Sequence, residues 1–286
     1  MAPDVADELP DSFVHALHAA VRETSPEGVV IGEVWEDGTT KVAYDVRRRH
    51  LLGGHLDGLM NYPFRTAMID YLRGGDAAEF KRVMEQQREN YPEFAFYSAM
   101  NSLGTHDTLR ILTLLGAGGE FRDQSKEWRA NFRLSPEQRK LGKERLMAAA
   151  ALLFCFPGSP TVYYGDEAGM EGFEDPLNRQ TYPWGGEDRE LMDWFRALGS
   201  LRKTRPALRS GDISYLAGDG PLLAFTRVAG GEKLLCAVNA GDKPARLELD
   251  TAQTLRPLLG QAETGETPFG CCLTLPPRSG CIFCVE

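Results

Sequence analysis

Long apolar runs are absent from this chain, and no stretch approaches the roughly 20 residues that a membrane-spanning helix needs. Residues 1–4 also lack the basic and then apolar pattern of a secretory signal. Basic residues are in the minority, with 32 against 41 acidic residues, and the formal net charge of -9 argues against a nucleic-acid or anionic-membrane partner. The sequence contains no internal repeat and no low-complexity segment. These absences predict a cytoplasmic globular protein, unless a longer parent chain carries a signal.

The six cysteines favour buried thiols over a metal or redox site. Cys281 and Cys284 have the C-x-x-C spacing that is found in zinc and redox sites. This pair lies in an apolar terminal stretch, however, and Cys155 and Cys236 also lie inside apolar runs. Because a free cysteine packs as a small hydrophobic residue, reduced core thiols are the better interpretation and a zinc or redox site is the alternative.

The order of the predicted elements divides the 286 residues into two parts near residue 210. Before it, strand-like runs alternate with helical patterns, which is α/β organisation. One of the helices opens with the Ser-x-x-Gln capping box of Ser135 and Gln138. After residue 210, short runs separated by Gly-Asp and Gly-Gly turns are typical of a small antiparallel β domain. We therefore expect domains at residues 1–209 and 210–286.

The number of strands before residue 210 is too low for a complete barrel. Four strands are predicted, near residues 29–34, 56–61, 98–104 and 160–165. A (β/α)8 barrel needs eight strands and about 250 residues. The sequence therefore predicts half a barrel.

Two acidic residues stand where predicted strands end. Glu33 lies at the end of the apolar run 29–34, and Asp107 follows His106 just after the run 98–104. Active sites of parallel barrels are built at this end of the strands. Trp35 offers an apolar face on which a sugar ring can stack. Since two carboxyl groups in different protonation states cleave glycosidic bonds, the pair suggests that reaction.

Five motifs span nearly all of the chain before residue 210. They are DVADE at residues 4–8, GEVW at 32–35, DGLMNYP at 57–63, GTHDT at 104–108, and a longer one running from YYGDE at 163–167 through Asp175-Pro176 and Arg179 to Pro183-Trp184. In this order they resemble the α-amylase family of glycoside hydrolases, and more closely its neopullulanase and cyclomaltodextrinase branch. The resemblance implies an α/β fold: the C-terminal half of a (β/α)8 TIM barrel, from the end of its fourth strand, followed by a small antiparallel β-sandwich domain.

The resemblance also implies roles for seven residues. Asp4 matches the nucleophile, Glu33 the general acid/base and Asp107 the transition-state stabiliser. These roles fit a retaining enzyme, in which two carboxyl groups lie about 5–5.5 Å apart. Four residues match substrate-binding positions: Trp35, His106, Asp175 and Arg179. No metal ligand is assigned and no cofactor is required, while calcium stays open for the half of the barrel that the sequence lacks.

Each of these residues has a structural alternative. Glu33 could be an ordinary capping or surface acid, and Asp107 could cap a helix that starts near Thr108. Core packing is the alternative for His106 and Trp35, and a surface ion pair is the alternative for Asp175 with Arg179.

Asp4 departs most from the family pattern. The family normally has an arginine two residues before the nucleophile, and this sequence has Ala2 there. An acid beside a chain end, with no strand to hold it, should be mobile. A disordered remnant of the motif is therefore the alternative for Asp4.

The function implied by the resemblance is retaining cleavage, by double displacement, of α-glucan bonds in maltodextrins, cyclodextrins or pullulan. An α-glucan oligosaccharide is the expected partner. Because half of the barrel wall is missing, we expect the chain to be inactive alone, and its unpaired strand edges predict self-association. The alternatives are a non-catalytic glucan-binding protein on the same fold and a transglycosylase, which shares the acids and differs in how well it excludes water.

Overall fold

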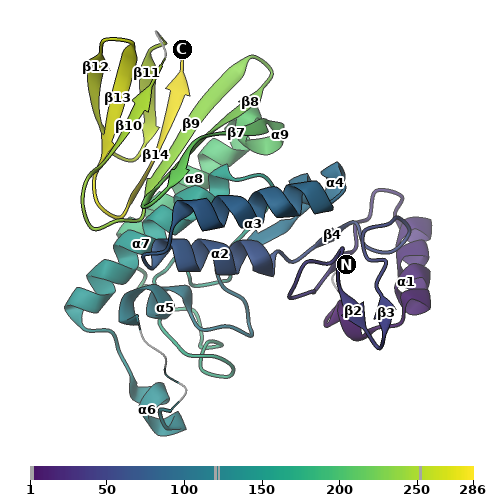
Figure 1. Ribbon diagram of the computed structural model, residues 1–286. Helices are drawn as coiled ribbons and strands as arrows, with labels where there is room; N and C mark the ends of the chain where they lie inside the picture. Colours follow the sequence, from purple (N-terminus) through teal and green to yellow (C-terminus); the bar gives the residue numbers. More distant parts are fainter. Residues whose placement is uncertain (1–2, 119–120, 122, 251–252) are drawn as a thin grey trace. The chain divides into compact units, whose positions relative to one another are not determined.

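The computed structural model describes residues 3–118, 121, 123–250 and 253–286 (Figure 1). These residues divide into two compact units that interleave along the chain. Unit 1 comprises Met1–Ala67, Phe80–Ser102 and Pro157–Thr161, and unit 2 comprises Met68–Glu79, Leu103–Phe156 and Val162–Glu286. The helices α2 (Tyr62–Leu72) and α3 (Ala77–Asn90) contribute residues to both. The domain boundary near residue 210 falls inside unit 2 and stays a prediction.

Unit 1 is built around a parallel array of short strands. These are β1 (Ile31–Gly32), β4 (Gly58–Leu59), β5 (Met100–Ser102) and β6 (Ser159–Thr161). β1 pairs with β4 and β5 pairs with β6, while a bridge between Met60 and Met100 joins the two pairs. Each strand lies in or overlaps one of the four segments predicted as strands. Val30, Val34 and Leu59 are buried, as expected where a sheet is covered on both faces.

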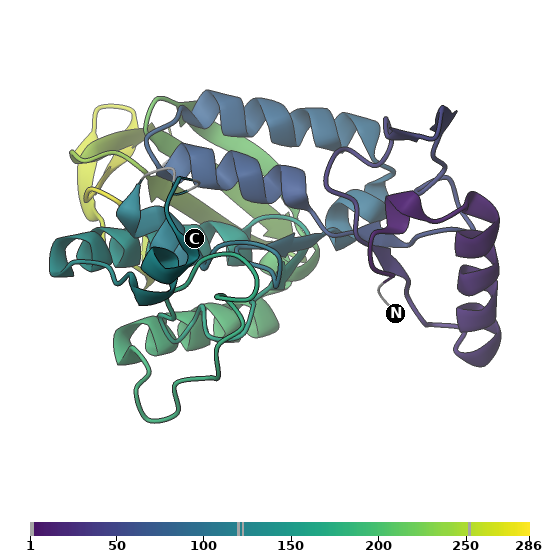
Figure 2. The ribbon, with the colours of Figure 1, turned by 90° about the horizontal axis from the view of Figure 1, so that it is seen from below.

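The other elements of unit 1 precede and separate these strands. They are η1 (Ala6–Glu8), α1 (Asp11–Thr24), β2 (Val42–Ala43), β3 (Val46–Arg47) and α4 (Glu93–Ser98). Asp57 ties α1 to the array, because its carboxylate accepts hydrogen bonds from Arg22 Nη2 at 2.6 Å and from the Val30 amide at 2.8 Å. Figures 1 and 2 show α2 and α3 side by side, and Phe64 packs edge-on against Phe80 between them.

The helices that lie wholly in unit 2 are α5 (Ile111–Ala117), α6 (Lys126–Asn131), α7 (Pro136–Cys155), α8 (Arg189–Thr204) and α9 (Pro206–Ser210). Helix α7 opens with the predicted capping box, in which the side chains of Ser135 and Gln138 each bind the other's backbone amide. Helices α5 and α7 approach closely at two glycines. A Cβ on Gly142 would lie 2.9 Å from Leu112 O, and one on Gly116 would lie 2.5 Å from Gln138 O. Larger residues there would push the helices apart.

Two antiparallel sheets follow α9 in unit 2 (Figure 1). The three-stranded sheet has the order β10 (Ala245–Leu249), β13 (Gly270–Leu275), β12 (Glu263–Thr267). The five-stranded sheet has the order β11 (Leu255–Leu259), β14 (Ser279–Val285), β9 (Glu232–Asn239), β8 (Leu222–Ala229), β7 (Asp212–Asp219). One apolar core, which includes Leu247, Leu273 and Phe283, joins the two sheets. On the other face of β14, Gly280 leaves room for Ala151 of α7.

The cysteines are free thiols, and five of the six are buried. Burial raises the pKa of the Cys281 thiol to about 12, so this member of the C-x-x-C pair stays protonated and unreactive at neutral pH. None of the described helices combines the length and the apolar character that crossing a membrane requires.

Candidate active site

Glu33 is the predicted catalytic acid that the structure holds most firmly. It follows β1 directly and is only 4% exposed. Its carboxylate accepts hydrogen bonds from Val5 N at 3.0 Å, from Trp35 Nε1 at 3.2 Å and from the Tyr62 hydroxyl at 3.3 Å. A buried carboxyl group needs such donors, because burial without partners is strongly unfavourable. This environment does not fit an ordinary surface acid.

Asp4 lies in a segment that runs beside Glu33. The Glu33 amide donates to Pro3 O at 3.3 Å, and the Ala6 amide donates to Glu33 O at 3.0 Å. Asp4 stands between these two contacts and has an exposed side chain. The structure therefore brings the backbone of Asp4 next to Glu33, while the catalytic role of Asp4 stays a prediction. Ala2, at the position where the family has arginine, lies outside the described residues.

Trp35 and Tyr62 form an aromatic pair beside the Glu33 carboxylate. Their rings stack with centroids 4.1 Å apart and an interplanar angle of 12°. Tyr62 is 4% exposed, whereas Trp35 is 47% exposed. One face of the indole is thus supported by a buried ring, and much of the residue remains open to solvent. Trp35 is therefore not packed in a core, and its role as a surface for a sugar ring stays a prediction.

The other predicted residues gather around Asp107 in unit 2. His106 Nε2 lies 3.2 Å from Asp107 Oδ2, and Arg179 Nη2 lies 3.7 Å from Asp107 Oδ1. Arg179 Nε also pairs with Asp175 Oδ1 at 2.9 Å, so Arg179 bridges the two carboxylates. Helix α5 begins at Ile111 with no side-chain cap, and Asp107 is therefore not its capping residue. The His106 side chain is 43% exposed, which excludes a core histidine.

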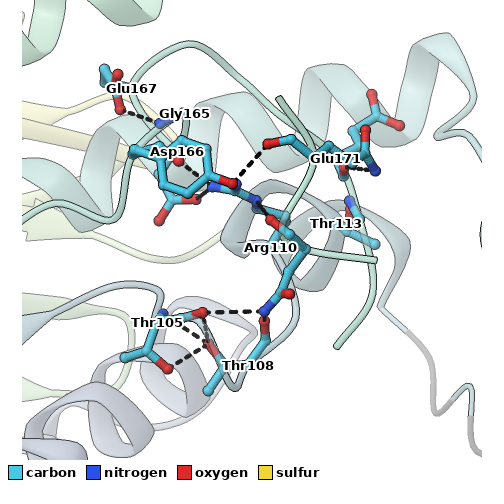
Figure 3. A network of polar contacts seen from close by, with 12 residues as sticks. Thr105, Thr108, Arg110, Thr113, Gly165, Asp166, Glu167 and Glu171 are labelled. Atoms are coloured by element: carbon cyan, nitrogen blue, oxygen red, sulfur yellow. Dashed lines mark hydrogen bonds and ion pairs between the residues drawn. The ribbon is translucent and has the colours of Figure 1, made fainter. Parts of the chain in front are cut away.

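A buried asparagine fixes the loop that carries His106 and Asp107. Asn178 is fully buried, and its Nδ2 donates to the carbonyl oxygens of His106 at 2.7 Å and Thr108 at 2.9 Å, with Thr105 O at 3.4 Å. Within the loop, Thr108 Oγ1 accepts a hydrogen bond from the Thr105 amide at 3.0 Å (Figure 3). The loop is therefore anchored through its main chain, which leaves the side chains of His106 and Asp107 free for other contacts.

A buried ion pair supports this asparagine. Arg110 and Asp166 are both 0% exposed, and Arg110 Nη1 lies 3.2 Å from Asp166 Oδ1. Arg110 Nε donates to Asn178 O at 2.9 Å, and its Nη1 donates to Tyr164 O. The guanidinium also lies over the rings of Tyr163 and Tyr164, 4.4 and 4.7 Å from their centroids. Figure 3 shows Arg110 between the turn at Asp166 and the loop anchored by Asn178.

The Arg110–Asp166 pair explains the glycine of the GTHDT motif. A Cβ on Gly104 would lie 2.5 Å from Asp166 Oδ2. The backbone holds Gly104 in place and the charge of Arg110 holds the Asp166 carboxylate, so neither residue can move aside easily. A glycine is therefore needed at position 104, because any side chain there would collide with Asp166 of the Arg110–Asp166 ion pair.

Sequence reasoning missed Arg110 and Asn178 of this arrangement, and it gave Tyr62 no role beyond its place in a motif. Each lies in or beside a motif, Tyr62 within DGLMNYP, Arg110 two residues after GTHDT, and Asn178 directly before Arg179. Proximity to a motif was the available signal, but the partners of these side chains are distant in sequence.

The predicted site residues fall into two groups, one in each unit. Asp4, Glu33 and Trp35 belong to unit 1, and the cluster around Asp107 belongs to unit 2. The convergence of Glu33 and Asp107 on one sugar ring stays a prediction. Among the described residues, no group of three or more His, Cys, Asp or Glu side chains could hold a metal ion.

Known proteins match this chain along almost its whole length. Residues 8–205 match the family described as "Alpha amylase, catalytic domain". The amylopullulanase of Thermoanaerobacter thermohydrosulfuricus is 32% identical over 276 residues, which cover 88% of this chain and 17% of that protein. The cyclomaltodextrinase of Geobacillus thermopakistaniensis is 30% identical over 293 residues, which cover 99% of this chain and 44% of that protein.

A solved structure also matches this chain in fold. The crystal structure of the debranching enzyme from Nostoc punctiforme has a TM-score of 0.80 and 30% sequence identity, covering 99% of this chain and 57% of that chain. This chain therefore spans less than two thirds of the length of each of these proteins.

Proposed function

This chain belongs to the α-amylase family, and we propose that it forms the C-terminal half of the catalytic barrel of a retaining α-glucan hydrolase, followed by a β-sandwich domain. The resemblance to the family and to its cyclomaltodextrinase and neopullulanase branch, predicted from five motifs, is confirmed. The proposed substrates are maltodextrins, cyclodextrins or pullulan, in keeping with the names of the relatives. The cytoplasmic location stays a prediction, and calcium binding stays open.

The observation that carries the proposal is the setting of Glu33. A buried carboxyl group with three hydrogen-bond donors, beside an open aromatic face, is arranged to act on a sugar held against that face. In the proposed double displacement, Asp4 attacks the anomeric carbon while Glu33 gives a proton to the departing oxygen. Glu33 then takes a proton from a water molecule whose oxygen attacks the anomeric carbon, which breaks the bond to Asp4 and releases the sugar. Asp107 would stabilise the positive charge that develops on the ring.

The parallel array of unit 1 supports the half-barrel. Its four strands are neighbours in sequence order, β1 to β4 to β5 to β6, as in one half of a (β/α)8 barrel. We propose that the active enzyme needs four further strands, which belong to the part of the relatives that this chain does not span. Alone, the chain should have little or no activity.

The test is complementation. The purified chain would be assayed for reducing-sugar release from maltodextrin, β-cyclodextrin and pullulan, alone and together with the preceding barrel half of the Geobacillus cyclomaltodextrinase. We expect activity only in the complemented protein. Glu33→Gln should abolish it, whereas Glu36→Gln, which alters an exposed acid paired with Lys41, should not.

Each outcome has a defined meaning. Turnover by the chain alone at about 1–10³ s⁻¹ would refute the need for the other half. Activity that survives Glu33→Gln would refute the catalytic assignment. A complemented protein that binds acarbose without cleaving any glucan would support the glucan-binding alternative, and oligosaccharide products longer than the substrate would support a transglycosylase.

Open strand edges also lead us to propose self-association. Among the described strands, β6 pairs with β5 on one side only. An exposed edge presents unpaired amide and carbonyl groups, which invite another chain. Light scattering behind a sizing column should give a mass above 31.7 kDa for the chain alone, and a monomer at high concentration would contradict the proposal.

A further inference from the structure

A pocket of about 460 Å³ lies in unit 1, and its residues include none of those assigned to catalysis. Its polar lining consists of Thr39, Arg47, Arg48, Arg49, Asn90 and Tyr91. The rest of the lining is glycine and apolar residues, and no acidic side chain takes part. A pocket with three cationic side chains and no anionic one suggests a negatively charged ligand.

The pairing of β2 with β3 explains why the three arginines differ in exposure. The Arg48 amide donates to Lys41 O at 2.9 Å, which extends the pairing beyond Arg47. Successive residues of an extended strand point to opposite sides. Arg48 is accordingly buried, with 7% exposure, whereas Arg47 and Arg49 are exposed.

Arg48 serves the fold and adds a fixed positive charge behind the pocket. Its guanidinium lies 3.5 Å from Asp11 and donates to the carbonyl oxygens of Asp7, at 2.8 Å, and Leu9. Burial and the Arg48 charge both lower the pKa of His50. Asp11 and Asp7 act on the same pKa in the opposite direction, so Arg48 is a partly compensated charge behind the pocket.

Arg47 and Arg49 have no acidic partner in the described part of the chain. Arg47 Nε and Nη2 donate to Thr39 O at 3.1 and 2.9 Å, which holds this guanidinium at the pocket. The neighbouring acid, Asp37, accepts hydrogen bonds from Thr39 Oγ1 at 2.6 Å and from Asn90 Nδ2 at 2.7 Å instead. Two positive charges thus stand at the pocket without a counter-charge.

We propose that this pocket binds a phosphate group, either as inorganic phosphate or as the phosphate of a small organic ester. Guanidinium groups bind phosphate oxygens through paired, charge-assisted hydrogen bonds. A phosphate monoester carries a charge of about -1.5 to -2 at neutral pH, which matches two uncompensated arginines better than a single carboxylate does. The volume exceeds what one phosphate ion fills, and pockets for small organic ligands start at about 300 Å³.

Binding can be measured on the chain itself, without catalytic activity. Isothermal titration at low ionic strength would use inorganic phosphate, glucose 1-phosphate, glucose and acetate as separate probes. We expect binding of one or both phosphate probes, no binding of glucose, and at least tenfold weaker binding of acetate. Equal affinity for phosphate and the ester would identify a free-phosphate site, and tighter binding of the ester would show that its sugar is also held.

Variants of the pocket arginines test whether phosphate binds at this pocket. Arg47→Gln and Arg49→Gln should each weaken phosphate binding at least tenfold, and the double variant should lose it. Arg88→Gln, which removes an exposed arginine of α3 with the same change in net charge, is the matched control and should bind as the parent does. Circular dichroism would show that each variant is folded. The proposal is overturned if no phosphate probe binds the folded chain, or if all three single variants weaken binding equally.

Discussion

Replacing Asp166 by asparagine should destabilise unit 2 strongly. The change keeps the size of the side chain and removes the charge that compensates Arg110. At the 3.2 Å separation of Arg110 Nη1 and Asp166 Oδ1, the attraction is about 5 kcal/mol for an effective dielectric constant of about 20. Arg110 would keep its hydrogen bonds to the carbonyl oxygens of Tyr164 and Asn178, which limits the loss. We therefore expect a loss of about 3–5 kcal/mol in unfolding free energy, the usual range for breaking a buried ion pair.

Thermal unfolding followed by circular dichroism would measure the effect. For a protein of this size, 1 kcal/mol corresponds to at least about 2 °C, so Asp166→Asn should lower the midpoint by about 6–10 °C. Asp193→Asn is the control, because its pair with Arg196 is exposed and such pairs contribute about 1 kcal/mol or less.

A double-mutant cycle separates the ion pair from general packing. Arg110→Met alone leaves a buried carboxylate, and Asp166→Asn alone leaves a buried guanidinium. The double variant leaves neither, so its destabilisation should be smaller than the sum of the two single effects by about 2 kcal/mol or more. Additive effects, or a midpoint for Asp166→Asn within 2 °C of the parent, would refute this account of the network.

Two further predictions concern single buried groups. Asn178→Ala should lower the unfolding free energy by about 1–3 kcal/mol and speed amide exchange at Thr108, because two loop carbonyls lose their donor; unchanged exchange would contradict the anchoring role. Burial raises the pKa of Asp57, but the Val30 amide and Arg22 outweigh it and hold the pKa below its ordinary 3.8. The stabilisation is thus complete above pH 3.8 and is lost as the pH falls further, so urea titrations should show Asp57→Asn about 1–3 kcal/mol less stable at pH 7, with a difference that shrinks in acid.

Features that depend on neighbouring residues could be predicted from the sequence. The capping box of Ser135 and Gln138 joins residues three apart, and the structure contains it. The strand segments were equally visible, because runs such as 29–34 are mostly β-branched. In the structure these strands are shorter than the runs that predict them, and β1 and β4 pair only through Ile31–Gly32 and Gly58–Leu59.

Long-range side-chain contacts could not be predicted in this way. Asn178 binds carbonyl groups 70–73 residues earlier in the chain. Because every residue has a main-chain carbonyl group, the sequence does not show which ones accept these hydrogen bonds. The structural alternative for Asp107 shows the same dependence on distant contacts. Its position before Thr108 fits a helix cap, but the structure turns its carboxylate toward His106 and Arg179. Local patterns single out Asp107, whereas its partners depend on how distant segments fold together.

Asn178 anchors residues 105–108 through their main-chain carbonyl groups, and the side chains of His106 and Asp107 take no part in this anchoring. Under the proposed function, in which His106 binds substrate, substitutions at position 106 should change substrate recognition while the backbone stays in place. A library of variants at this position, in a background that keeps Asn178, is a rational starting point for altering glucan preference.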